Sequence, residues 1–172
     1  MSRPGRDEYA EYYGRYIDKV PDGDVIAMLE SQGNTTQKLL ASVGEENAGY
    51  RYEPGKWSIK QVIGHITDSE RVFAYRLVAI ARGEKQPLPG FDQDEYMETA
   101  NFDARSLAEL AEGLASTRHA TLTLIRSLDD EAWNRRGVAS DNPVSARALA
   151  WIIAGHERHH AGILRDRYGI AT

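Results

Sequence analysis

The chain has 172 residues, of which 41% are hydrophobic and 27% are charged. This length and composition are typical of one folded domain and exclude a disordered or low-complexity chain. Its 26 acidic residues outnumber its 21 basic ones, which gives a formal net charge of −5. We therefore expect no nucleic-acid partner, and no membrane partner either, because no apolar run is long enough to cross a bilayer.

Cysteine is absent from the chain. Disulfides, thiolate metal ligands and a cysteine nucleophile are therefore excluded together, and any metal site must use His, Asp or Glu. The N-terminal residues 1–16 are charged and rich in tyrosine, and they lack the apolar stretch of a secretory signal. The expected location is therefore cytoplasmic.

Four segments carry the apolar spacing of helices, and each is followed by a residue or loop that ends a helix. They are approximately residues 22–43, 58–83, 106–128 and 145–168. Ser58 with Gln61, and Ser106 with Glu109, form capping boxes at the starts of the second and third segments. Strand signals are scarce, because Val, Ile and Thr rarely alternate with polar residues.

Amphipathic helices bury their apolar faces most simply against one another, so the sequence predicts an all-α fold, a four-helix bundle. A long polar loop, about residues 84–103, is expected between the second and third helices. Residues 129–143 are expected to form a further irregular connection. We treat residues 1–172 as a single domain. Its residues 1–20 are an N-terminal extension, whose tyrosines we expect to pack on the bundle or a partner subunit rather than bind a ligand.

The fourth segment carries two histidines, His156 and His160, one helical turn apart on its apolar face. Both imidazoles should therefore point into the bundle, either as a hydrogen-bonded structural pair or as metal ligands. His65 lies at the edge of the apolar stripe of the second segment, where a lone histidine is usually a core or boundary residue. A bundle can nevertheless bring His65 opposite the other two, and three imidazoles with one open position are the pattern of a catalytic divalent site.

The remaining histidines are weaker candidates. His159 competes with His160, because residues three apart also share a helix face, but it lies farther from the apolar stripe. His119, in the third segment, is expected at the surface or boundary of the bundle. The run His156-Glu157-Arg158-His159-His160 matches the H-E-x-x-H pattern of metalloproteases. We do not assign a protease from it, because the chain lacks the usual protease bulk around the motif.

Two charged residues follow His65 on the second segment. Asp68 lies about one turn later. Its carboxylate is expected either to support a metal ligand or act as a general base near the metal, or to be exposed to water at the boundary of the bundle. Arg76 lies about three turns after His65 on a similar face. It could grip a carboxylate of the substrate or thiol, although pairing with one of the chain's many acids is the favoured role. In the following loop, Phe91 and Tyr96 could shape a pocket, although a solvated loop is favoured.

These segments resemble the DinB-like superfamily of four-helix-bundle metalloproteins, and especially its YfiT-type branch. The matching stretches are GKWSIKQVIGHITDSER at residues 55–71 and GHERHH at residues 155–160, with the spacing between them and the N-terminal segment 16–29. The resemblance covers about residues 9–168. It implies a bundle of the up-down-down-up type with a long crossover, and it implies metal binding by His65, His156 and His160.

Members of this family are often dimers, so the resemblance implies a homodimer. Some members are described as metal-dependent hydrolases, and others are transferases or isomerases that use a low-molecular-weight thiol. The resemblance therefore implies an enzyme that acts on a small-molecule substrate with a divalent metal ion. Zinc is the favoured metal, with nickel, manganese and iron as alternatives.

Thiol transfer is the reaction that we expect first. An open position on the metal can bind a thiol and deprotonate it, and the thiolate then attacks an electrophilic carbon. Because the chain has no cysteine, that thiol must be an external cosubstrate. The alternatives are a hydrolase that uses metal-bound hydroxide, and a non-catalytic, metal-binding bundle related to stress. A last alternative is that the histidines are core hydrogen-bonding residues that bind no metal.

Overall fold

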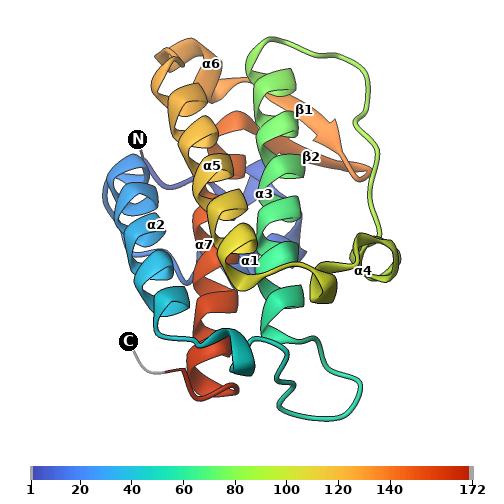
Figure 1. The fold of residues 1–172 in the computed structure, drawn as a ribbon. Helices are drawn as coiled ribbons and strands as arrows, with labels where there is room; N and C mark the ends of the chain where they lie inside the picture. The colour runs from blue at the N-terminus through green and yellow to red at the C-terminus, as the bar shows by residue number, and fades with distance from the viewer. Residues whose placement is uncertain (1, 171–172) are drawn as a thin grey trace.

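Four long helices run side by side in the computed structural model, which describes residues 2–170 (Figure 1). They are α2 (Val25–Ala41), α3 (Ile59–Ala81), α5 (Leu107–Arg126) and α7 (Ala146–Asp166). The predicted all-α four-helix bundle is therefore confirmed. Each helix begins at a capping residue, because the side chains of Asp24, Ser58, Ser106 and Ser145 accept hydrogen bonds from backbone N–H groups of the first turn.

The helices do not surround the core in sequence order. α2 packs against α5 and α7, and α3 packs against the same two helices, so α2 and α3 lie on a diagonal of the bundle. α3 and α5 run in the same direction, and the long connection between them returns along the outside of the bundle (Figure 1). This is the crossover topology that the family resemblance implies.

A layer of buried polar residues divides the core into two apolar clusters. One cluster joins the C-terminal half of α3, including Phe73 and Leu77, to the N-terminal half of α7, including Trp151. The other joins the N-terminal half of α3, including Ile63, to the C-terminal end of α7 at Leu164. Between them, α3, α5 and α7 bury His65, Glu70, Arg118, His156, Glu157 and His160. Because buried polar groups are unfavourable unless they are paired, this layer is where a functional site is expected.

The connection between α3 and α5 is long, as predicted, but it is not entirely irregular. It contains α4 (Gln93–Ala100) and the 3-10 turn η3 (Phe102–Ala104). Asp92 caps α4, because its Oδ1 accepts hydrogen bonds from the backbone N–H groups of Asp94 and Glu95. The prediction of a loop is therefore wrong for these residues, and the Asp-x-x-Glu spacing at residues 92–95 is the signal that indicates the helix start.

The connection between α5 and α7 also departs from the predicted irregular chain. It forms α6 (Asp130–Asn134) and an antiparallel hairpin of β1 (Arg136–Ala139) and β2 (Asn142–Ser145), in which Arg136 pairs with Ser145. Ser140 and Asp141 make the turn with φ angles of 51° and 60°, a backbone that usually takes Asn-Gly. The sequence lacks that signal, so the hairpin could not be predicted from its turn.

The N-terminal segment packs on the bundle through the 3-10 turn η1 (Arg6–Glu8) and α1 (Glu11–Ile17), which lies against α7. The buried carboxylate of Glu8 accepts hydrogen bonds from Ser145 and Arg147 at the start of α7. A further 3-10 turn, η2, covers Glu45–Asn47. Within residues 2–170, no helix combines the length and the apolar character that crossing a bilayer requires.

Candidate metal centre

Three histidines from two helices meet in the buried polar layer. α3 carries His65, and one turn of α7 carries His156 and His160, with exposed fractions of 5%, 5% and 9%. One ring nitrogen of each histidine lies within 4.8 Å of those of the other two, and the Nε2 atoms of His65 and His156 are 3.1 Å apart. The structure therefore brings together the three histidines that the sequence analysis singles out as candidate metal ligands.

This donor set fits a divalent metal ion. Nitrogen ligands at about 2.0–2.1 Å from a tetrahedral metal lie about 3.3 Å from each other, close to the separation of His65 and His156. Burial lowers the pKa of His65 to about 4. Burial, together with the neighbouring histidines, holds the pKa of His156 and of His160 well below the usual range. All three imidazoles are therefore neutral at pH 7, which is the form that binds a metal.

Aromatic packing, rather than hydrogen bonding, orients the three rings. In the described part of the chain, the bond between His65 and His156 is the only hydrogen bond that any of them makes. Metal-binding histidines usually donate their other ring N–H to a carboxylate or a carbonyl. Here the ring of Trp57 lies 4.8 Å from that of His65, and the rings of Tyr16 and Phe73 lie 5.2 and 5.7 Å from that of His156. Substitutions of these aromatic residues should therefore disturb the ligands.

Two glycines allow other elements to approach the histidines closely. Gly155 precedes His156, and an added Cβ would collide with the backbone carbonyl of Tyr16 in α1. Gly64 precedes His65, and an added Cβ would lie 2.5 Å from the ring of Phe102. Both glycines belong to the stretches that carry the family resemblance. A glycine is needed at each position because any side chain would block the close packing beside His65 or His156.

His159 and His119 lie outside the cluster. His159 is half-buried, and its ring packs 5.0 Å from that of His160 and 5.3 Å from that of Tyr16. It lines a different cavity from the one beside the cluster. His119 is exposed on α5. The geometry therefore agrees with ranking His160 above His159.

Asp68 does not join the histidines either. Its carboxylate forms an ion pair with Arg71 at 2.9 Å, and 32% of its side chain is exposed. The position that faces the cavity one turn after His65 belongs to Ser69. A shift of one residue turns a helix position by about 100°, which is enough to direct Asp68 to the surface. A role for Asp68 as a base therefore has no contact in this structure to support it.

A cavity of about 360 Å³ adjoins the histidine cluster. His65, His156, Ser69 and Phe73 form its inner wall. The rest of its wall comes from α1, the start of α4 with the two residues before it, and the hairpin turn. It consists of Tyr12, Tyr13, Tyr16, Phe91, Asp92, Gln93, Asp94 and Ser140. The tyrosines of α1 are predicted to serve packing alone, whereas the structure also places three of them at the cavity. Phe91 lines the cavity too, although a solvated loop is the favoured prediction for it, and Tyr96 is not part of the wall.

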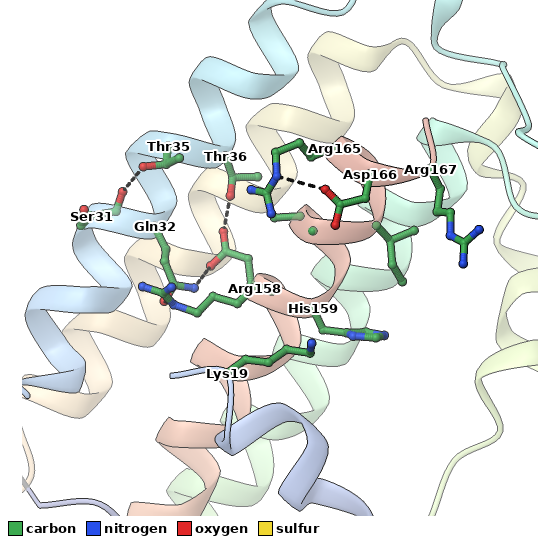
Figure 2. Close-up of a pocket in the computed structure, with 14 residues that line it drawn as sticks. Lys19, Ser31, Gln32, Thr35, Thr36, Arg158, His159, Arg165, Asp166 and Arg167 are labelled. Carbon is green, nitrogen blue, oxygen red and sulfur yellow. Dashed lines mark hydrogen bonds and ion pairs between the residues drawn. The ribbon is translucent and has the colours of Figure 1, made fainter. Parts of the chain in front are cut away.

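A buried ion-pair network occupies the rest of the polar layer. Arg118 of α5 donates to both carboxylate oxygens of Glu70, at 2.9 and 2.7 Å, and its Nη2 lies 2.8 Å from Glu157. Glu157 also accepts hydrogen bonds from Thr36 and Gln32 of α2, at 2.6 and 3.0 Å (Figure 2). Because its carboxylate is held in this way, Glu157 is not free to act as the base that the H-E-x-x-H pattern suggests.

Glu70 and Arg118 are the members of this layer that sequence reasoning missed. Arg118 lies four residues after Leu114 and four before Leu122, so it occupies the apolar face of α5. A charged residue in such a position indicates a buried ion pair. The spacing does not reveal its partners, because they come from α3 and α7.

A larger cavity, about 520 Å³, is lined mainly by α2 and α7 (Figure 2) and by none of the three clustered histidines. Lys19, Arg158, His159 and Arg167 are among the residues that line it. Arg158 donates a hydrogen bond to Gln32 at 3.1 Å, which ties this wall to α2. The donor set, rather than the size of a cavity, therefore identifies the candidate metal centre.

Comparison with known proteins identifies the family to which this chain belongs. A family model described as the DinB superfamily matches residues 28–164, a range that includes all three histidines. A protein of Oceanobacillus iheyensis, provisionally named a metal-dependent hydrolase, is 25% identical over 138 residues. The match covers 78% of this chain and 78% of that protein.

Solved structures share the fold. YfiT from Bacillus subtilis, described as a probable metal-dependent hydrolase with an unusual four-helix bundle topology, matches with a TM-score of 0.71 and 16% identity. That match covers 99% of this chain and 95% of the other. A mycothiol-dependent maleylpyruvate isomerase matches with a TM-score of 0.67 and 16% identity, over 85% of this chain and 61% of the other. At these identities the likeness concerns the fold alone.

Proposed function

Because the chain belongs to the DinB superfamily, we propose that His65, His156 and His160 hold a divalent metal ion and that the protein is a metal-dependent enzyme. The observation that carries the proposal is the convergence of three buried, neutral imidazoles beside a cavity. The names of the Oceanobacillus relative and of YfiT support a role for a metal. We propose zinc, since nitrogen ligands suit it and three-histidine zinc sites are well represented among enzymes.

A bound divalent metal would supply a Lewis acid that lowers the pKa of a coordinated water or thiol. The residues of the cavity would bind and orient the substrate. Phe73 and Tyr13 provide an aromatic wall, with ring centroids 6.0 Å apart. Burial and the neighbouring Tyr12 raise the pKa of Tyr16, so its hydroxyl keeps its proton at neutral pH. Arg15 donates to that hydroxyl at 2.8 Å, and the hydroxyl of Tyr12 lies 3.4 Å from it.

We propose thiol transfer as the reaction. The carboxylates closest in sequence to the histidines are already engaged, because Asp68 pairs with Arg71 and Glu157 pairs with Arg118. Because these two carboxylates are not free to act as a base, the site favours a nucleophile that loses its proton readily. A thiol, with an ordinary pKa of about 8.5, ionises far more readily than water, with a pKa of about 15.7. The fold shared with a mycothiol-dependent isomerase is consistent with an external thiol cosubstrate.

Hydrolysis is the second candidate function. It is favoured by the names of the Oceanobacillus relative and of YfiT, both of which describe metal-dependent hydrolases. The two reactions differ in their need for an added thiol. For either reaction we propose a small-molecule substrate and a homodimeric protein, as the family resemblance implies.

Metal content tests the proposed site. Protein purified without chelator should contain about one metal ion per chain by inductively coupled plasma mass spectrometry. His65→Ala, His156→Ala and His160→Ala should lose that metal, whereas His159→Ala, a matched control one residue away, should keep it. Wild-type protein that binds no metal after reloading with zinc, nickel or manganese would overturn the proposal.

The need for a thiol tests the proposed reaction. Zinc-loaded protein can be assayed with dinitrochlorobenzene and mercaptoethanol, and separately with nitrophenyl acetate in the absence of thiol. Turnover that requires the thiol and is lost in His156→Ala supports thiol transfer. Ester cleavage that needs no thiol and shows the same loss would replace thiol transfer with hydrolysis.

A further inference from the structure

Arg76 of α3 is a buried cation that forms no ion pair with any residue of the described range 2–170. Only 2% of it is exposed. Its Nη2 donates hydrogen bonds to the backbone carbonyl of Pro89 at 2.7 Å and to Oγ of Ser140 at 2.9 Å, and both acceptors are uncharged. Among residues 2–170, no acidic side chain lies within 4.0 Å of its guanidinium nitrogens. The favoured prediction, that Arg76 pairs with an acid of the chain, is therefore wrong.

Arg118 provides a comparison within the same protein. It is buried to a similar degree, at 4% exposed, and two carboxylates compensate its charge, those of Glu70 and Glu157. Burying a charge is strongly unfavourable unless an opposite charge accompanies it. Arg118 therefore has the partners of a structural cation, whereas Arg76 has no such partner in the part of the chain that the structure describes. Its Nε and Nη1 groups bond to no acceptor of the described residues, which leaves three N–H groups for a ligand.

The surroundings of Arg76 belong to the cavity beside the histidines. The guanidinium lies 5.6 Å from the centroid of the Phe91 ring. Phe91 and Ser140 both line that cavity, as do His65 and His156. Arg76 therefore lies directly behind the wall of the cavity, next to two of the side chains that form it.

Arg76 and His65 lie far apart along α3. Arg76 follows His65 by eleven residues on one continuous helix, which separates their Cα atoms by about 16 Å along the axis. Ser69 and Phe73, which lie between them on α3, line the cavity along that path. A ligand of several bonds' length along this path could therefore reach from the histidines to the part of the wall, formed by Phe91 and Ser140, that lies next to Arg76.

The acidic residues of this cavity, Asp92 and Asp94, form no ion pair with Arg76. Asp92 and Asp94 line it and are exposed. Asp92 is engaged as the cap of α4, through the backbone N–H groups of Asp94 and Glu95. A single negative charge brought by a ligand would balance the single positive charge of Arg76.

We propose that Arg76 binds a carboxylate of the substrate, so that the enzyme acts on small carboxylic acids whose reacting group lies at the histidine end of the cavity. This proposal rests on the proposed function. Guanidinium groups bind carboxylates through charge-assisted hydrogen bonds, and a monoanion leaves the buried site neutral. Arg76 is then a residue that determines specificity, and it takes no part in bond making.

Two probes of matched length test this assignment by binding alone. Mercaptohexanoate and its neutral counterpart mercaptohexanol both carry a thiol for the metal end, but only the first carries a carboxylate. Isothermal titration calorimetry on zinc-loaded wild-type protein should give an affinity for the acid about ten-fold or more above that for the alcohol. Arg76→Gln should bind both equally and leave the affinity for the alcohol unchanged. Arg71→Gln, an exposed arginine of the same helix, should keep the wild-type preference.

The outcomes separate this assignment from the metal site. Zinc-loaded wild-type protein that binds the acid no more tightly than the alcohol, or binds neither, overturns the role of Arg76 and leaves the metal site intact. Wild-type protein that takes up no zinc shows instead that the proposed function has failed. If Arg76→Gln does not fold, as judged by thermal unfolding, Arg76→Lys replaces it, because it keeps the charge and should retain part of the preference.

Discussion

His65 of α3 and His156 of α7 bring their Nε2 atoms to within 3.1 Å of each other, although 91 residues separate them in the chain. Without a metal, one imidazole donates this hydrogen bond and the other accepts it, so the two rings cannot both be cations in this arrangement. Protons and metal ions therefore compete for the same ring nitrogens. Both pH and metal should change the stability of the protein.

Chelator-treated protein should lose stability as the pH falls from 7 to 5. Burial lowers the pKa of His65 from an ordinary 6.5 to about 4, so between these values the unfolded chain binds a proton that the folded chain does not. Stability therefore rises with pH across this window, by up to about 3 kcal/mol from His65 alone. Urea unfolding at several pH values measures this slope.

The slope should be shallower in His65→Ala, because the group that resists protonation is gone. His119→Ala removes an exposed histidine instead and should keep the wild-type slope. Equal slopes in wild type and His65→Ala would show that the buried imidazole does not control the pH dependence.

Added zinc should stabilise the wild-type protein against heat. A ligand that binds only the folded state, at a free concentration of about 1,000 times its Kd, contributes about 4 kcal/mol. His160→Ala should lose most of this effect, and His159→Ala should keep it. Thermal unfolding with and without zinc gives the comparison, and an equal zinc response in both variants would argue against His160 as a ligand.

Gly155→Ala should destabilise the protein by roughly 1–3 kcal/mol, because overpacking forces the backbone to shift. The new Cβ would meet the carbonyl of Tyr16, so α1 would have to move away from α7. Gly162→Ala on the same helix is the matched control, since the nearest atom to its added Cβ would be Nη2 of Arg165 at 3.7 Å. That variant should be neutral or more stable by up to about 1 kcal/mol, and urea unfolding distinguishes the two.

Arg118→Met should destabilise the protein by about 3–5 kcal/mol, because it leaves two buried carboxylates without their cation. Arg126→Met, at the end of the same helix, removes an exposed partner of Glu30 and should change stability by less than about 1 kcal/mol. Chemical unfolding of both variants measures the difference. If Arg118→Met were as stable as Arg126→Met, the ion-pair network would not contribute to the fold.

Local sequence determines the long helices of this protein and the direction of their side chains. Apolar spacing and the caps at Ser58 and Ser106 act within a few turns, so the helix limits follow from neighbouring residues. The same holds for His156 and His160, whose spacing of four residues places both on one face. Short elements such as the hairpin at residues 136–145 escape this reasoning, because a hairpin depends on pairing rather than periodicity.

Tertiary structure alone decides which side chains meet. Periodicity gives the direction of a side chain about its own helix axis, but not which helix lies in that direction. The diagonal placement of α2 and α3 makes α3 and α7 neighbours, so His65 meets His156, and Arg118 reaches Glu70 and Glu157. The same packing leaves Arg76 beside the cavity without an acid from residues 2–170 as an ion-pair partner. Its missing partner could not be read from a sequence that contains 26 acidic residues, because pairing depends on distances that only the folded chain sets.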